Sequence, residues 1–137
     1  MKIENIKFKA KRLDNNTWVE GYFYAECGNT YIIEDRQSES MLNRNEAHQV
    51  DPSTVCQFTG LKDCEGNELY EHDVIKNYPF IPSEIVWSEE LSGYYLTHAN
   101  GKIYEKPLGY YLSLGKFIFV DNKFDKKEVA YGKTNNN

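Results

Sequence analysis

The sequence predicts an all-β fold made mainly of antiparallel strands, and three observations lead to this prediction. The 137 residues include 11 Tyr, 7 Phe and 2 Trp, and aromatic side chains are favoured in strands. Apolar and β-branched residues occur in short runs, in which polar residues alternate with apolar ones. Gly, Asn, Asp and Pro, which are the residues that form turns, separate these runs.

The N-terminal part begins with three predicted strands that form a meander. In residues 6–11, Ile, Phe and Ala alternate with three Lys, which indicates a half-buried strand with a basic outer face. A turn at 14–16 leads to a second strand over 17–24. Gly28-Asn29 is typical of a two-residue hairpin and joins the second strand to a third over 30–33.

Residues 34–49 are polar except for Met41-Leu42. We expect a long loop here, with or without a single helical turn. Loops of this length are either functional or disordered.

Residues 50–76 predict a compact β element of strand, turn, strand, corner and strand. Asp63 and Gly66 suit the first and last positions of a type I turn. Residues 55–59 before this turn and 68–70 and 74–75 after it have strand character, and the polar residues 71–73 form the corner.

The C-terminal part predicts further short strands. Residues 77–83 form a loop with an apolar tip, Phe80-Ile81. Strands are expected over 85–87 and 94–97, and Asn100-Gly101 is a strong hairpin signal that leads into residues 102–104.

The last apolar segments are less uniform. Residues 108–114 suit either a strand or one to two helical turns, and 117–120 suit a strand. Residues 123–137 are polar, and we expect them to fray.

Fifteen positions between 50 and 76 follow a family pattern: Val50, Asp51, Pro52, Thr54, Val55, Gln57, Phe58, Thr59, Gly60, Leu61, Asp63, Gly66, Tyr70, Glu71 and Asp73. The opening residues 6–10, Ile-Lys-Phe-Lys-Ala, are also typical of this pattern. On these residues the chain resembles the YopX family of phage and prophage proteins. His72 stands where the family usually has Gly, so this corner must use either another geometry or a histidine in the left-handed region.

The resemblance implies a small, mainly β phage protein that contains an SH3-like barrel, and it implies no biochemical activity. We therefore divide the chain into a meander with a polar loop (1–49), an SH3-like bent barrel (50–124) and a flexible polar tail (125–137). We expect the structural signature to hold the fold rather than form a site. Its residues are Thr54, Gln57, Thr59, Gly60, Asp63, Gly66, Tyr70 and Asp73.

The charge pattern bears on partners. The net charge of −5 disfavours tight binding to duplex nucleic acid. Residues 2–12 carry a local charge of +4 and residues 34–73 a local charge of −7. These segments form either two solvated faces or a dipolar surface that favours one charged partner.

The sequence gives little support for a metal site or for a cysteine nucleophile. Cys56, Cys64 and His72 are eight residues apart, and Cys27 and His48 could join them, but structural zinc sites use closer pairs. Acidic residues flank Cys64 and disfavour its thiolate. We expect reduced thiols, no metal and no cofactor.

We therefore expect a non-enzymatic phage accessory protein that acts through protein contacts in the cytoplasm of a bacterial host. No apolar run approaches the ~20 residues of a membrane span, and the N-terminus lacks the apolar region of a signal peptide. Self-association through Phe80, Ile81 or a strand edge is also expected.

Two alternatives remain open. The first is a nucleic-acid-associated module that uses the basic residues 2–12 and exposed tyrosines, for which Tyr94-Tyr95 and Tyr110-Tyr111 are candidates. The second is an acidic mimic that blocks a host nucleic-acid-binding protein through residues 34–73.

Overall fold

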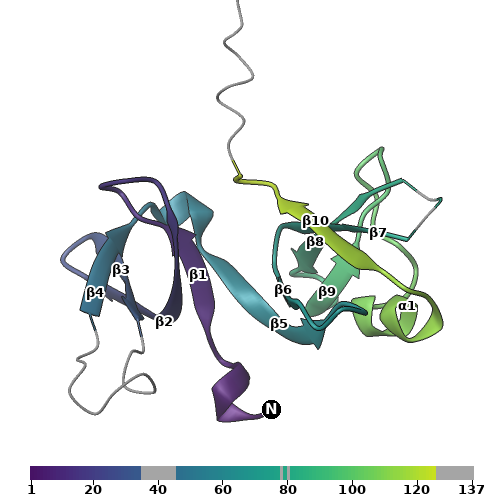
Figure 1. Ribbon diagram of the computed structural model, residues 1–137, viewed down its shortest axis with the longest axis horizontal. Helices are drawn as coiled ribbons and strands as arrows, with labels where there is room; N and C mark the ends of the chain where they lie inside the picture. Colours follow the sequence, from purple (N-terminus) through teal and green to yellow (C-terminus); the bar gives the residue numbers. More distant parts are fainter. Residues whose placement is uncertain (35–45, 78, 80, 126–137) are drawn as a thin grey trace, which may run out of the picture. The chain divides into compact units, whose positions relative to one another are not determined.

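The computed structural model describes residues 1–34, 46–77, 79 and 81–125 and confirms the all-β class. The chain forms two compact units (Figure 1). Unit 1 contains residues 1–62 and 68–71, and unit 2 contains residues 63–67 and the chain from His72 onward. The units thus divide near Lys62 rather than at the predicted position 49/50, because the strand over 56–62 begins by pairing Cys56 and Gln57 with the first strand.

Unit 1 contains six antiparallel strands in the order β4-β3-β2-β1-β5-β6. The strands are β1 (Phe8–Lys11), β2 (Trp18–Glu26), β3 (Asn29–Glu34), β4 (Glu46–Val50), β5 (Cys56–Lys62) and β6 (Glu68–Tyr70). Two 3-10 turns, η1 (Ile3–Asn5) and η2 (Pro52–Thr54), precede β1 and β5.

The predicted loop over 34–49 is wrong at its end, because Glu46–Val50 forms β4. These polar residues become a strand by pairing with β3 along its whole length, from Thr30↔Val50 to Glu34↔Glu46. Tertiary pairing thus overrides local propensity. The remainder of that loop, residues 35–45 with Met41-Leu42, lies outside the described residues.

The core of unit 1 follows the predicted alternation of residues 6–11 only in part, because β1 begins at Phe8 and Ile6 is 42% exposed. Ala10 is fully buried with Val19, Ile32 and Val50, and Phe8 packs against them. The lysine face also differs from the prediction, since Lys7 and Lys9 are half-buried and Lys11 is only 7% exposed. Its ammonium group lies 5.2 Å from the centre of the Trp18 ring, which covers it.

The β2–β3 hairpin turns one residue earlier than predicted. Glu26 pairs with Asn29, so the two turn residues are Cys27 and Gly28. Both have positive φ, +52° and +81°, as a type I′ turn requires. Asn29 is therefore the first residue of β3.

At Gly21 the pairing of β2 changes from β1 to β3. Gly21 lies opposite Phe8, and the next residue, Tyr22, lies opposite Ile33. A methyl group at Gly21 would lie 2.0 Å from the carbonyl oxygen of Ile33. Only glycine allows this approach of two backbone segments.

Unit 2 contains four antiparallel strands in the order β10-β7-β8-β9 and one helix. The elements are β7 (Asp73–Lys76), β8 (Ser83–Ser88), β9 (Gly93–Leu96), α1 (Leu108–Leu114) and β10 (Ile118–Asn122). The ambiguous segment 108–114 is helical, and Pro107 stands at its N-cap. Ile75, Ile85, Leu96 and Leu108 form the buried core.

Asn100-Gly101 forms a tight turn, but the predicted hairpin is incomplete because no strand directly follows the turn in the described part of the chain. Gly101 has φ +89° and donates its N–H to the His98 carbonyl at 2.9 Å. A single bridge, Thr97↔Ile103, continues the pairing.

Strand pairing closes neither sheet into a barrel within the described residues, so the part of the chain predicted as an SH3-like bent barrel forms an open sheet there. In unit 1 an isolated bridge between Arg12 and Val50 joins the ends of β1 and β4. The predicted start of a barrel at Val50 is instead the last residue of β4.

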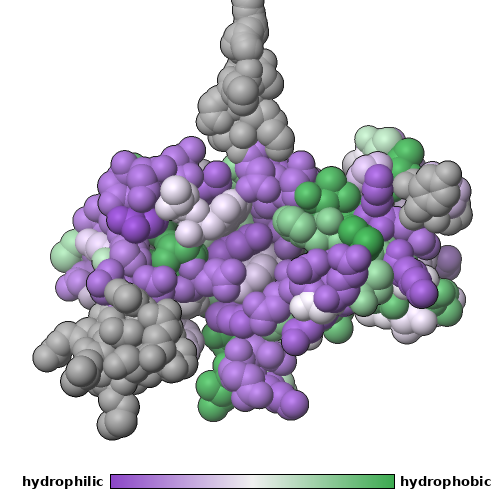
Figure 2. Space-filling model, in the orientation of Figure 1, coloured by the Kyte–Doolittle hydropathy of each residue, from purple (hydrophilic) through white to green (hydrophobic). Residues whose placement is uncertain are grey.

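On the face drawn in Figure 2 most of the surface is hydrophilic. Hydrophobic residues show at η1 and over β10, where Ile3 is 81% and Val120 44% exposed. Scattered exposed apolar side chains are common on soluble proteins and do not by themselves mark a site.

The turn over 63–66 has the predicted geometry and allows a direct test. Gly66 has φ +88° and donates its N–H to the Asp63 carbonyl at 3.1 Å. A side chain at Gly66 would meet no atom within 4 Å, so only backbone strain opposes it. Gly66→Val is expected to lower the free energy of unfolding by about 1–3 kcal/mol in urea denaturation. Gly66→Asn, which tolerates positive φ, should cost less; equal losses would contradict the turn assignment.

Candidate functional site

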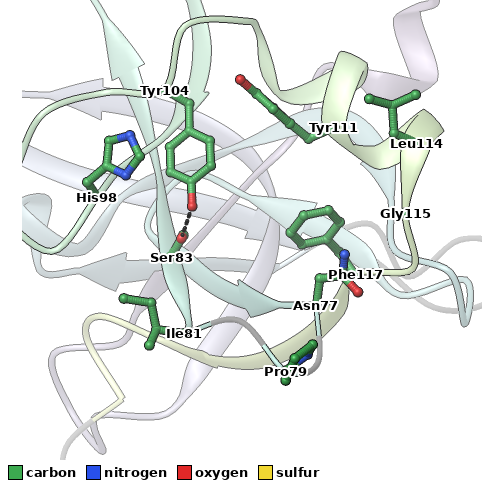
Figure 3. Close-up of a pocket in the computed structure, with 10 residues that line it drawn as sticks. All are labelled: Asn77, Pro79, Ile81, Ser83, His98, Tyr104, Tyr111, Leu114, Gly115 and Phe117. Carbon is green, nitrogen blue, oxygen red and sulfur yellow. Dashed lines mark hydrogen bonds between the residues drawn. The ribbon is translucent and has the colours of Figure 1, made fainter.

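The candidate site is a cavity of about 570 Å³ in unit 2. Three segments and one helix surround it: the loop after β7, the start of β8, the turn that follows β9, and α1 with the residues after it. Figure 3 shows these side chains arranged around an open space. They are Asn77, Pro79, Ile81, Ser83, His98, Tyr104, Tyr111, Leu114, Gly115 and Phe117.

Aromatic rings form one wall of the cavity. The rings of His98 and Tyr104 stack with their centres 4.2 Å apart, and Tyr111 meets Tyr104 edge-on at 5.1 Å. The tight turn at Gly101 brings His98 and Tyr104 together, because the His98 N–H donates to the Lys102 carbonyl at 2.8 Å. α1 supplies Tyr111. These contacts hold the wall in a fixed geometry before any ligand binds.

The described lining residues include few polar side chains. The hydroxyl groups of Ser83 and Tyr104 lie 3.1 Å apart in a hydrogen bond, which Figure 3 marks. None of the ten lining residues is Asp, Glu, Lys or Arg. An apolar hollow with a few placed polar groups is the usual form of a binding site.

The cavity is open at an apolar rim. Ile81 is 64% and Leu114 68% exposed, although both are large aliphatic side chains. Next to Leu114 the chain is tightly packed, since a methyl group at Gly115 would lie 2.8 Å from Asn77 Nδ2.

Sequence reasoning identified parts of this cavity without assembling them. Ile81 lines it as part of the predicted apolar tip, whereas Phe80 lies outside the described residues. Tyr111 lines it and Tyr110 is 46% exposed, while Tyr95 is buried in the core. The sequence signal for the cavity was that aromatic and apolar residues gather in segments predicted as loops, where they do not belong to the buried face of a strand.

The signature residues in unit 1 make backbone contacts. Thr54 Oγ accepts the Lys11 N–H at 2.9 Å, and Thr59 Oγ donates to the Leu69 carbonyl at 2.8 Å. The Gln57 carbonyl accepts the Glu71 N–H at 2.9 Å. Gly60, with φ +87°, lies where the β5–β6 register shifts, so β5 continues past it to Lys62. Tyr70 is buried, with its ring 5.4 Å from that of Phe58.

The signature residues in unit 2 centre on Asp63, which is 6% exposed. Its carboxylate accepts the Glu65, Asn67 and Phe119 N–H groups and the Asn67 side-chain amide, at 2.8–2.9 Å. Burial raises the pKa of Asp63, but these hydrogen bonds together outweigh burial and lower it below the ordinary value.

Asp73 and His72 also have structural contacts. Asp73, which is fully buried, accepts from the Asn122 side-chain amide at 2.8 Å. His72 has φ +72°, so it adopts the left-handed conformation considered for this corner. Its Nδ1 lies 2.7 Å from a Glu84 carboxylate oxygen.

The candidate metal ligands of the sequence do not come together. Cys27 and Cys64 are exposed, Cys56 is buried, and none forms a disulfide. In the described part of the chain, one group of three possible ligands lies within 4.8 Å: Glu34, Glu46 and His48. His48 is the only predicted candidate in it, and its Nε2 already contacts Glu34 at 3.2 Å. We assign no metal to this group.

The basic residues in and beside β1 have their charged groups in contact with other residues of unit 1. Lys7 forms an ion pair with Glu68 at 2.7 Å, and Lys9 lies 4.7 Å from the centre of the Trp18 ring. Arg12 pairs with Asp14 at 2.6 Å, which lowers the Asp14 pKa. These contacts would compete with binding to a phosphate backbone.

Comparison with known proteins identifies the family. No curated protein and no solved structure matches the chain. Among the described residues, no helix has the length and apolar character needed to span a bilayer. The family model described as YopX protein matches residues 7–106, which is most of the chain and includes the signature. The chain therefore belongs to the YopX protein family.

Proposed function

We propose that this protein is a non-enzymatic interaction module of a phage or prophage, acting in the bacterial cytoplasm, and that its unit 2 cavity binds an apolar segment of a protein partner. The mainly apolar and aromatic lining of the cavity carries this proposal. Burying apolar side chains there would gain about 25 cal/mol for each Å² removed from water. Exposed Ile81 and Leu114 would become covered in the complex.

The lining favours binding over catalysis. General acid–base chemistry needs titratable groups within hydrogen-bond reach of each other. The His98 ring stacks on the face of Tyr104, and the Ser83 hydroxyl bonds to the Tyr104 hydroxyl instead of to a base. These lining residues thus offer no activated nucleophile.

Peptide selection tests the proposal with the full-length protein. A random library of peptides of about a dozen residues would be selected separately on wild type, Leu114→Glu and Leu91→Glu. Leu91 is an apt control because it is 52% exposed and does not line the cavity. Both substitutions are at exposed positions, so stability should change by only about 0.5 kcal/mol.

Wild type and Leu91→Glu are expected to enrich the same apolar peptides. Leu114→Glu should weaken their binding about tenfold or more, because each bound peptide would leave a carboxylate buried against apolar groups. Equal binding by all three proteins would exclude the cavity as the binding site.

The partner that covers Ile81 could also be a second copy of this chain. Light scattering across a concentration series would then show a rise in molecular mass, and Ile81→Glu would abolish that rise.

A further inference from the structure

Two lysines lie beside the cavity. Lys76 immediately precedes Asn77, and Lys116 stands between Gly115 and Phe117, so each lysine adjoins cavity residues in sequence. With Asn77 and Ile118 they line a second hollow of about 390 Å³. Asn77 belongs to both hollows, which therefore adjoin.

The β7–β10 ladder explains this placement. Ile118 pairs with Lys76, which fixes the end of β7 beside the start of β10. Just before β10, Gly115 approaches the Asn77 side chain so closely that no Cβ fits without displacing it. Lys76 and Lys116 consequently lie at the same end of the strand pair, next to the aromatic cavity.

Both ammonium groups are available to a ligand. Lys76 and Lys116 are exposed, and within residues 1–34, 46–77, 79 and 81–125 neither forms an ion pair. Lys7 differs, since Glu68 already neutralises it. None of the described residues that line the cavity is Lys or Arg, which would attract the anion instead.

We propose that the occupant of the cavity is a peptide segment in which an acidic residue lies within one or two positions of an apolar residue. The apolar side chain enters the aromatic cavity, and the carboxylate binds between Lys76 and Lys116. An extended residue spans about 3.3–3.6 Å, so such neighbours can reach two adjoining hollows. This inference rests on the proposed function and specifies its ligand.

A carboxylate fits the two lysines better than a nucleic acid does. A single-stranded nucleic acid carries a phosphate on every nucleotide and is held by a basic groove that follows its backbone. Two lysines match one or two carboxylates, and the net charge of −5 opposes a polyanion.

The test compares two double variants of the full-length protein. Lys76→Gln/Lys116→Gln removes the pair, and Lys2→Gln/Lys62→Gln removes the same charge from two exposed positions in unit 1. The probes are the cavity-dependent peptides from the selection, the same peptides with each Asp or Glu replaced by its amide, and single-stranded oligothymidine of about a dozen nucleotides.

The acidic peptides are expected to bind Lys76→Gln/Lys116→Gln about tenfold more weakly than wild type, while the control pair binds them normally. The amide peptides should bind all three proteins equally, and added salt should weaken only the acidic peptides. Apolar peptides without acidic residues, or equal losses in both double variants, would overturn this inference and leave the proposed function standing. Failure to select any cavity-dependent peptide would contradict both this inference and the proposed function. Oligothymidine that binds more tightly than the peptides and depends on Lys76 and Lys116 would reassign the site to nucleic acid.

Discussion

Gly21→Ala is expected to destabilise the protein by about 3 kcal/mol or more, because its methyl group would lie 2.0 Å from the Ile33 carbonyl oxygen. A flexible side chain could rotate away from such a clash, but a backbone carbonyl within a strand pair cannot. Relief would require β2 and β3 to separate where Tyr22 pairs with Ile33. Thermal and urea unfolding would measure the loss.

Gly28→Ala is the matched control. Gly28 has φ +81°, but a side chain there would meet nothing within 4 Å. Its cost should be limited to backbone strain of about 1–2 kcal/mol. If Gly21→Ala cost no more than Gly28→Ala, the close approach of β2 and β3 would be refuted.

Asp63→Ala is expected to cost about 2–4 kcal/mol, because it removes the acceptor of four hydrogen bonds. The Phe119 N–H, which bonds from a residue far along the chain, and the two Asn67 donors would lose their charged partner. Asp63→Asn keeps one acceptor oxygen and should cost less. Equal unfolding free energies for wild type and Asp63→Ala would show that these hydrogen bonds add no net stability.

The lowered pKa of Asp63 gives this prediction a pH dependence. Its pKa is lower in the folded chain than in the unfolded chain, so the unfolded state takes up the proton first as the pH falls. The stabilisation is therefore complete above about pH 4, the range of an unfolded Asp, and is lost as the pH falls further through the folded pKa. Asp63→Asn should flatten the decline of unfolding free energy below pH 4. An unaltered pH profile would contradict the pKa direction.

The sequence predicted the fold class because most signals were local. The alternation of residues 6–11, the turn at 63–66 and the short apolar runs each depend on neighbours along the chain. The strand Glu46–Val50 was missed because Glu46, His48 and Gln49 are polar, and the pairing with β3 holds the segment extended. The hairpin was misplaced by one residue because Cys27, which has no intrinsic preference for positive φ, adopts it in the folded hairpin.

The cavity could not be predicted because its parts are distant in sequence. Ile81, Tyr104 and Phe117 carry no shared spacing or motif, and the fold of unit 2 alone brings them together. Lys76 and Lys116 are separated by 39 intervening residues and become neighbours of one hollow through the β7–β10 register. By contrast, Asp63 could be recognised as a turn residue from the sequence. The hydrogen bond that it accepts from the Phe119 N–H could not be predicted.

The interleaving of the two units has a consequence for inheritance. The chain passes between the units three times, after residues 62, 67 and 71. A recombination point after the codon for Lys62 would separate most of unit 1 from its edge strand β6. β6 would then be encoded together with unit 2. Recombination therefore cannot exchange either unit as one continuous coding segment. An exchange of one complete unit by a single continuous segment would therefore carry part of the other unit with it.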